Sequence, residues 1–411
     1  MEMTEDIVIV GAGIAGLATA LGLHRQGLRS IVLESSESLR SSGFALGLWT
    51  NAWRALDALA IGDSLRQQSL PITEFQVISA DSGLEKSSVP LDVYKNRNSE
   101  CRCLRRKLLL ETLEKKLPQG TVRYSSKVVL IEESGPYKLV HLADGSLVRT
   151  KVLIGCDGVN SVVAKWLGLQ KPVDSKRAEI RGFVEYPDKH GFEPKFHLLV
   201  GAQVHFGFIP CDDNGMYWFY NFTPSIAHFD QSATKDPVKL KEFVLSKIKN
   251  ASNEVKGVVE RTPLDCISCA GLKLRLPWNV LLGDIVRNNI CVAGDALHPM
   301  TPDIGQGGCS ALEDSVLLAR RLGEAFLLKP GGAVADEEFE RIRYGLDRYA
   351  KERRCRSFLL ISCAYLIGSI QGSDNRVVSF LRDNFLARYT LAIVLGMADF
   401  DCGKLLSSRL I

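Results

Sequence analysis

Two glycine-rich segments, each next to a carboxylate, are the parts of this chain best suited to chemistry. The first is Gly11-Ala-Gly13-Ile-Ala15-Gly16, which follows the apolar run 7–10. Gly11 permits a tight turn, Gly13 lets the backbone approach a phosphate, and Gly16 lets a helix pack closely on a strand. The unpaired N–H groups at the start of such a helix favour an anion. The segment therefore predicts a site for the pyrophosphate of a dinucleotide.

Glu34 supplies the carboxylate that belongs with this segment. It ends a second apolar run, 30–33, and stands 18 positions after Gly16. A carboxylate at about this spacing accepts hydrogen bonds from the adenosine ribose. The stretch between, 14–26, has helical periodicity and stops at Gly27. This context favours a dinucleotide over the alternative, a glycine-rich turn without a ligand, but it does not separate NAD from FAD.

The second segment is an apolar run, 289–294, that ends in the carboxylate of Asp295. The run before Asp157 has the same form, and ligands bind at the carboxyl ends of strands in open α/β sheets. A glycine-rich loop that leads into a helix suits an anion or the edge of an electron-rich ring. The first and second segments, in this order, predict FAD. Three further features lie between Asp295 and the next helical pattern: His298, Pro302 and the glycine-rich loop 305–308.

In type and order these motifs resemble the three fingerprints of the single-component (group A) flavoprotein monooxygenases, which include para-hydroxybenzoate hydroxylase, salicylate hydroxylase and zeaxanthin epoxidase. The resemblance covers essentially the whole chain. It is closest to the plant FAD-dependent monooxygenase-like proteins, whose Gly-Gln-Gly-Gly-Cys loop matches 305–309. It implies an α/β fold, with a Rossmann-like FAD-binding domain of the para-hydroxybenzoate hydroxylase type, an inserted and mainly antiparallel substrate sheet, and a helical C-terminal tail.

The resemblance also implies roles for individual residues. Asp295 would bind the ribityl hydroxyls, the loop 305–308 would lie along the isoalloxazine, and Pro302 would face the substrate. Arg106 would contact the FAD phosphates, with Arg105 as the competing candidate. Val128 would touch the adenosine part through its backbone. The implied cofactor-binding residues are Gly11, Gly13, Ala15, Gly16, Glu34, Arg106, Val128, Asp157, Asp295, Pro302, Gly305, Gly307 and Gly308.

Three positions depart from the family pattern. Ala164 stands where the family often has an arginine that helps to shape the route of the nicotinamide. Cys309 replaces an asparagine, a change that zeaxanthin epoxidase-like members share. Ser35 replaces the arginine that often follows the acidic residue of the second strand.

A single dinucleotide fold suits an enzyme in which NAD(P)H docks only transiently. The hypothesis is that NAD(P)H reduces FAD, that reduced flavin traps O₂ as a C4a-hydroperoxide, and that the distal oxygen hydroxylates or epoxidises an apolar, aromatic small metabolite. Because the cofactor supplies the difficult chemistry, no side chain is assigned as acid or base. His298 and Pro302 are the nearest candidates, and support of the loop is the alternative role for His298. The other functions considered are an oxidase or dehydrogenase without oxygen insertion, and a non-catalytic flavin-binding protein.

The pattern of runs and turns divides the chain into three parts. The FAD-binding domain is predicted over 1–72, 100–172 and 284–330. The substrate domain is predicted over 73–99 and 173–283, and a helical segment over 331–411. The first insert reads as a hairpin at 74–91. The second predicts strands at 180–186, 197–209 and 216–221, with a helix at 239–249.

Aromatic residues alternate along the second insert, which puts each set on one face of a strand. They are candidates for a substrate pocket over the flavin, and the alternative is a plain sheet core. The four candidates are Phe206, Phe208, Trp218 and Tyr220.

Composition limits the partners. The net charge of +4, from 51 basic and 47 acidic residues, is too balanced to predict a nucleic-acid partner. Eleven cysteines, an odd number, indicate reduced thiols in an intracellular, cytoplasmic protein, and no metal site is predicted. The uncharged stretch 357–373 is shorter than the ~20 apolar residues of a membrane span. We expect helices that cover the FAD-binding domain, with contact to a membrane surface as the minority alternative, in a monomer or homodimer.

Overall fold

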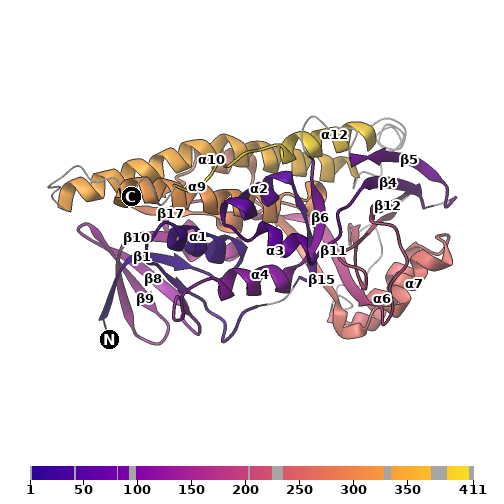
Figure 1. Ribbon diagram of the computed structural model, residues 1–411, viewed down its shortest axis with the longest axis horizontal. Helices are drawn as coiled ribbons and strands as arrows, with labels where there is room; N and C mark the ends of the chain where they lie inside the picture. The colour runs from indigo at the N-terminus through magenta and orange to yellow at the C-terminus, as the bar shows by residue number, and fades with distance from the viewer. Residues whose placement is uncertain are drawn as a thin grey trace.

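An eight-stranded mixed sheet forms the first layer of the computed structural model, which describes residues 2–40, 43–80, 82–91, 99–201, 204–224, 235–327, 335–371 and 387–406 (Figure 1). Its order is β16-β17-β10-β1-β2-β7, and β9 joins β8 to the edge of β10. The strands are β1 (Glu2–Val10), β2 (Ile31–Leu33), β7 (Val122–Arg123), β8 (Val128–Ser134), β9 (Tyr137–Leu142), β10 (Leu147–Gly155), β16 (Val286–Arg287) and β17 (Ile290–Val292).

The centre of this sheet is parallel, because β1 pairs in parallel with β2 and β10, and β10 with β17. Side chains at the ends of these strands are buried on both faces, as expected where helices cover a parallel sheet. The helices around it are α1 (Ile14–Arg25), α4 (Arg106–Lys115), α5 (Val162–Trp166) and α9 (Gly307–Leu327). The runs predicted at 7–10, 30–33 and 289–294 thus end at one edge of the sheet.

A second sheet of seven strands, called here the roof sheet, has the order β15-β11-β14-β13-β12-β4-β5. It joins the hairpin predicted at 74–91 to the later insert through parallel pairing of β12 with β4. Helices α6 (Pro237–Lys247) and α7 (Asn253–Arg261) pack on one of its faces (Figure 1). The strands are β4 (Glu74–Ser79), β5 (Glu85–Pro90), β11 (Val173–Glu185), β12 (Lys195–Gly201), β13 (Val204–Pro210), β14 (Gly215–Phe222) and β15 (Ile267–Leu274).

The single strand predicted at 197–209 is wrong, because the chain reverses within it. Strands β12 and β13 form an antiparallel pair in which Gly201 lies opposite Val204 and Leu199 opposite Phe206. Residues that lie opposite each other share a face, so one face carries odd-numbered residues on β12 and even-numbered residues on β13, and the alternation changes phase at the reversal. A turn then joins β13 to β14, and in it the Asp212 carboxylate accepts the N–H groups of Asn214 and Gly215.

A two-stranded ribbon, β3 (Ala45–Trp49) with β6 (Cys101–Arg105), connects the two sheets. Helices α2 (Thr50–Ala58), α3 (Gly62–Arg66) and α8 (Pro277–Leu282) pack nearby. The short 3₁₀ helices are η2 (Gly158–Asn160), η4 (Leu264–Cys266), η5 (Gly294–Ala296) and η6 (Pro302–Ile304). The tail is helical as predicted, with α10 (Ala335–Gln371) and α12 (Ala387–Ala398). In Figure 1, α10 runs along the upper edge over both sheets.

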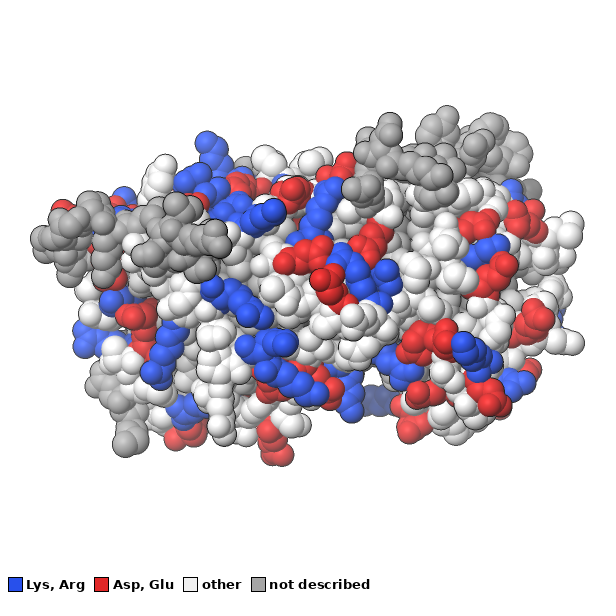
Figure 2. Space-filling view, in the orientation of Figure 1, with Lys and Arg blue, Asp and Glu red and all other residues white. Residues whose placement is uncertain are grey.

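Two apolar cores follow from this arrangement. The larger surrounds the first sheet and its helices, and the smaller lies between the roof sheet and α6 and α7. The exact domain boundaries proposed at 72, 99, 172, 283 and 330 stay predictions. The face in Figure 2 carries Lys and Arg side chains interspersed with Asp and Glu. Within the described ranges, no helix has both the length and the apolar character to cross a membrane.

Candidate functional site

The first glycine segment lies where the ends of β1 and β10 meet. Gly11 has a φ of +100°, and a Cβ placed there would lie 2.5 Å from the carbonyl oxygen of Cys156, so only glycine fits. The Gly11 N–H donates to the Leu33 carbonyl at 2.8 Å, which ties β1 to β2. Gly13 is the N-cap of α1, and a Cβ there would meet no described atom within 4 Å. The amino end of α1 therefore faces open space beside a tight turn.

Glu34 lies beside this turn, with its carboxylate buried and both of its oxygens hydrogen-bonded. One oxygen accepts the Ala12 N–H at 2.8 Å, and the other accepts Ser36 and the guanidinium of Arg40. Burial alone would raise the carboxyl pKa, but the bonds from Ser36, Ala12 and Arg40 lower it to about 2. Glu34 is thus a permanent anion. The family pattern often has an arginine after this carboxylate, where this chain has Ser35. In the structure, the guanidinium that pairs with Glu34 comes from Arg40.

The second segment reaches the same place from the other end of the chain. A Cβ on Gly294 would lie 2.8 Å from the Cβ of Ala15, so the turn at η5 packs directly on α1. The Gly294 N–H donates to the buried Asp314 carboxylate at 2.7 Å. Arg275, also buried, donates to the carbonyls of Ala296 and Leu297 at 3.0 and 2.9 Å. These bonds fix the backbone on both sides of Asp295, whose own side chain is exposed.

The loop 302–308 packs against the ribbon that joins the sheets. A Cβ on Gly305 would lie 3.0 Å from the Trp49 indole nitrogen, and one on Gly308 would lie 2.7 Å from Leu46. Gly307 starts α9 and faces open space, as Gly13 does at α1. Asp303 within the loop makes a two-pronged ion pair with Arg177 of β11, at 2.8 and 2.9 Å. The loop is therefore held from β3 on one side and from the roof sheet on another.

Three charged residues from separate elements, Asp295, Arg106 and Arg181, influence one another electrostatically. Burial lowers the pKa of Arg106, at the start of α4, while the nearby Asp295 carboxylate raises it and Arg181 lowers it. Burial also opposes the charge of Arg181 on β11, but Glu179, Tyr217 and Asp295 together raise its pKa. Asp295 is thus within electrostatic range of both guanidiniums.

The two candidate arginines take different directions. Arg105 pairs with Asp212 at 2.8 Å and with Glu185 at 3.2 Å, so it ties the ribbon to the roof sheet. Arg106 instead lies against Gly43, and its buried Nε has no partner among the described residues. The geometry therefore favours Arg106 over Arg105 as a group free to meet an anion at this site.

Three other candidates, Asp157, His298 and Val128, are partly or fully covered by neighbouring residues. Asp157 accepts bonds from Ser161 and from the N–H of Val162 at 2.5 and 2.7 Å, so its carboxylate caps α5, and burial raises its pKa. His298 is fully buried, with Nε2 at 2.7 Å from Asp314, which places it beneath the loop. Val128 is buried at the start of β8.

The aromatic candidates of the insert lie on the far face of the roof sheet, which corrects the predicted pocket. Phe206, Phe208, Trp218 and Tyr220 are at most 1% exposed and pack with α6 and α7 in the smaller core. They are cross-strand neighbours, Phe208 opposite Trp218 and Phe206 opposite Tyr220. The alternation correctly predicts that these four residues share a face, but it does not predict which face of the roof sheet meets the larger core. The plain sheet core, the alternative reading, describes these four residues.

The face that meets the larger core carries residues that the sequence reasoning missed. Tyr217 and Phe183 lie opposite each other there, next to Arg181, and Phe219 packs against the same core. Glu179 is buried on this face and hydrogen-bonded to Arg181. A usable signal was present: the charged residues at 177, 179 and 181 alternate with Ala178, Ile180 and Gly182, as expected for a face that meets something polar.

Known proteins share this architecture along nearly the whole chain. A family model described as an FAD binding domain matches residues 4–354. Monooxygenase 2 of Arabidopsis thaliana is 49% identical over 408 residues, which span 98% of this chain and 99% of that protein. This chain belongs to the FAD-dependent monooxygenase family. A further relative of this monooxygenase, 3-hydroxybenzoate 6-hydroxylase 1 of Aquipseudomonas alcaligenes, is 30% identical over 87% of this chain and 88% of that protein.

Solved structures agree on the fold of this monooxygenase. Klebsiella pneumoniae HpxO, complexed with FAD and uric acid, superposes with a TM-score of 0.82 at 22% identity, over 97% of this chain and 96% of that one. The p-nitrophenol 4-monooxygenase PnpA of Pseudomonas putida superposes with a TM-score of 0.76 at 20% identity, over 98% and 99%. The predicted family, fold and FAD cofactor are therefore confirmed. The chain is an FAD-dependent monooxygenase, and the roles of single residues stay predictions.

Proposed function

We propose that this monooxygenase uses NAD(P)H and O₂ to hydroxylate, or epoxidise, an apolar aromatic metabolite bound between the loop 302–308 and the roof sheet. The observation that carries the proposal is the meeting of remote segments. Gly294 packs on Ala15, and Asp295 lies within charge range of Arg106 and Arg181. This supports one continuous site, with its pyrophosphate end at α1 and its reactive end at the loop.

The residues at the site fit FAD. Gly13 and Gly307 face open space at the amino ends of α1 and α9, which favour anions and electron-rich groups. The buried Nε of Arg106 has no partner in the described chain, and a phosphate oxygen would satisfy it. We propose that Gly11 to Gly16 and Arg106 hold the pyrophosphate, and that Glu34 and the Val128 backbone hold the adenosine.

The reactive half would rest on the second segment. Asp295 would accept bonds from the ribityl hydroxyls, and Gly305 to Gly308 would let the backbone lie along the ring. When bound, FAD supplies the redox and oxygen-activating chemistry, with NAD(P)H as the transient electron donor. The protein would position the reactants and exclude water from the ring, because Trp49, Leu46 and the roof sheet enclose the loop.

The flavin-facing side of the roof sheet supports an aromatic substrate. Phe183 and Tyr217 offer aromatic surface, while Arg181 and Glu179 add fixed charges beside it. Burial raises the pKa of Tyr217 well above its usual range, so its hydroxyl stays protonated and is able to donate a hydrogen bond. Such a donor would orient a polar substituent of the ring.

The test uses the purified FAD-bound protein. Flavin bleaching by NADPH or NADH is followed anaerobically by stopped-flow absorbance, with and without each member of a panel of phenols. ¹⁸O₂ is then supplied, and the product is analysed by mass spectrometry. We expect at least one phenol to accelerate bleaching and to gain one labelled oxygen. Stoichiometric H₂O₂ with unlabelled product would establish an oxidase instead, and no bleaching by either nucleotide with any phenol would refute the proposal.

A further inference from the structure

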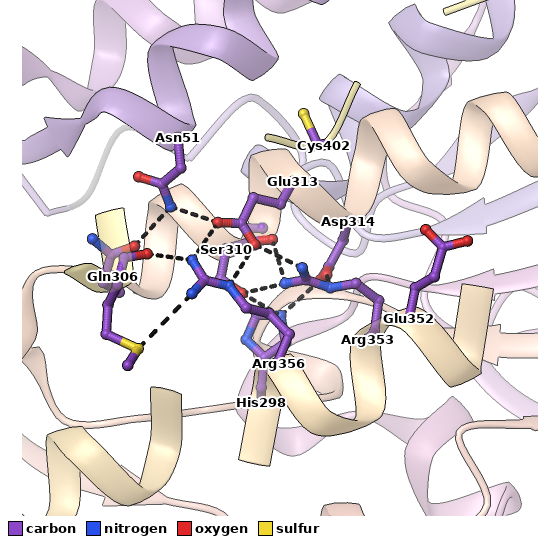
Figure 3. A network of polar contacts seen from close by, with 12 residues as sticks. Asn51, His298, Gln306, Ser310, Glu313, Asp314, Glu352, Arg353, Arg356 and Cys402 are labelled. Carbon is purple, nitrogen blue, oxygen red and sulfur yellow. Dashed lines mark hydrogen bonds and ion pairs between the residues drawn. The ribbon is translucent and has the colours of Figure 1, made fainter. Parts of the chain in front are cut away.

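Arg353, in the tail helix α10, lies at the centre of a buried polar network behind the proposed flavin site (Figure 3). Its side chain is fully buried and meets three residues of α9. Nη1 is 2.6 Å from Glu313, Nε is 2.5 Å from Asp314, and Nη2 donates to the Ser310 hydroxyl at 2.6 Å. One guanidinium thus contacts three side chains of that helix, at positions 310, 313 and 314.

The two carboxylates lead from Arg353 to different parts of the site. Asp314 accepts the Gly294 N–H at 2.7 Å and meets His298 at 2.7 Å, so it holds the turn before Asp295. Glu313 accepts the Asn51 amide at 2.5 Å, and the same amide donates to Gln306 at 2.8 Å. Gln306 belongs to the glycine loop. The network therefore connects both backbone segments of the second motif to one residue of the tail.

The charges in this network are fixed. Burial raises the carboxyl pKa values of Glu313 and Asp314, but nearby Arg353 outweighs it at both, helped by Arg356 at Glu313 and by His298 at Asp314. Burial opposes the charge of Arg353 too, yet its two anionic partners raise its pKa. Without Arg353, Glu313 would keep the ion pair with Arg356, and Asp314 would keep the contact with the His298 imidazole. Buried charge that is not fully compensated is costly.

We propose that Arg353 is a positioning residue for FAD: through Asp314 and Glu313 it sets the backbone at Gly294 and Gln306 against which the ribityl chain and ring rest. The inference builds on the proposed function, since it assumes that the second motif carries that half of the cofactor. It makes the tail helix part of the cofactor site, although α10 stands outside the strands and glycine motifs that the sequence identifies.

The chain offers a matched control one residue along. Arg354 lies on the same helix and donates to the carbonyls of Val280, Leu281 and Gly283 at 3.0, 2.8 and 2.7 Å, at the end of α8. Arg354→Met removes the same side chain and a similar set of bonds, but nothing that leads to Gly294 or Gln306. The comparison of Arg353→Met with Arg354→Met therefore separates an effect on cofactor position from a general loss of stability.

The experiment measures FAD affinity by quenching of flavin fluorescence, then the visible spectrum and reduction potential of each variant at saturating FAD. We expect Arg353→Met to raise the FAD Kd roughly tenfold or more, as loss of a supporting partner does at metal sites. We also expect it to shift the flavin bands and the potential. Arg354→Met should match wild type in all three readouts while melting at a lower temperature.

Arg353→Lys serves if Arg353→Met does not fold, because a single ammonium keeps the charge but cannot reach three partners. It should give an intermediate Kd and a partial spectral shift. Wild-type Kd, spectrum and potential in an Arg353 variant, or equal changes in the Arg354 variant, would overturn the inference. If the wild type binds FAD but shows no NAD(P)H-driven oxygenation, only the proposed function falls.

Discussion

Trp218→Phe tests which face of the roof sheet meets the substrate. The indole is fully buried between β14 and the helices α6 and α7, and its Nε1 donates to the Thr262 hydroxyl at 2.9 Å. Gly182 lies opposite on β11, where any Cβ would overlap the indole. The residue therefore supports the domain from the side away from the cofactor. We expect its replacement to cost stability and to leave FAD binding and substrate response unchanged.

The magnitude follows from what the indole loses. Truncation of a buried Trp to Ala costs ~3–5 kcal/mol, and because Phe keeps most of the ring, the packing loss is about 1 kcal/mol. The hydrogen bond to Thr262 adds about 1 kcal/mol. The Thr262 hydroxyl still donates to the Val258 carbonyl at 2.7 Å, so no donor is left unpaired. The sum, about 2 kcal/mol, corresponds to a fall of several degrees in Tm, at roughly 2–4 °C per kcal/mol.

The assay compares Trp218→Phe with its neighbour, Tyr217→Phe, which points to the opposite face. Thermal unfolding is followed by far-UV circular dichroism, and flavin reduction by NAD(P)H is measured with the most active phenol of the panel. Trp218→Phe should melt several degrees lower with normal kinetics, and Tyr217→Phe should melt near wild type with a raised KM for the phenol. An altered KM in Trp218→Phe at unchanged Tm would refute the assignment of faces.

Three further predictions concern the cofactor crevice. Arg106→Met should raise the FAD Kd about tenfold to a hundredfold, the scale of a lost charge-assisted hydrogen bond, while Arg105→Met stays near wild type; equal effects in fluorescence titration would contradict the choice between them. Glu34 is stabilising as an anion, so the stability gap between wild type and Glu34→Gln should persist above pH 4.5 and close as the pH falls towards the carboxyl pKa of about 2, measured by urea midpoints; a gap that widens in acid would exclude this account. Arg275→Met frees the carbonyls after Asp295 and should lower stability by about 3 kcal/mol and weaken FAD binding, and a variant with normal FAD affinity would show that this turn does not set the site.

Much of the site was predictable because its motifs are local. Gly11, Gly16 and Glu34 indicate a strand, a helix and a second strand that ends in a carboxylate, all within one short stretch. The structure has these elements where the sequence predicts them. Asp295 and the loop 302–308 also lie at a strand end and a helix start. The order of the two segments then identified the fold, since few architectures place both at one crevice.

The rest depended on contacts between distant parts of the chain. The alternation of Phe206 and Phe208 defines a face, but only the docking of α6 and α7 decides which face is covered. The reversal between β12 and β13 leaves only a change of phase in the alternation, from odd-numbered to even-numbered residues, and the single strand predicted at 197–209 overlooked it. Arg353 belongs to no recognisable sequence motif. Its proposed role depends on three partners that lie more than 30 positions away in the sequence.

The order of strands in the first sheet has a consequence for the synthesis of the protein. β1 lies between β2 and β10, and β10 receives β17 only when residues 290–292 have left the ribosome. At about 5–20 residues per second, the edge of β10 waits roughly 7–27 s for its last parallel neighbour. An unpaired edge is a template for pairing with another chain. Until β17 emerges, this edge of β10 is therefore a place where the nascent sheet is open to pairing with another chain.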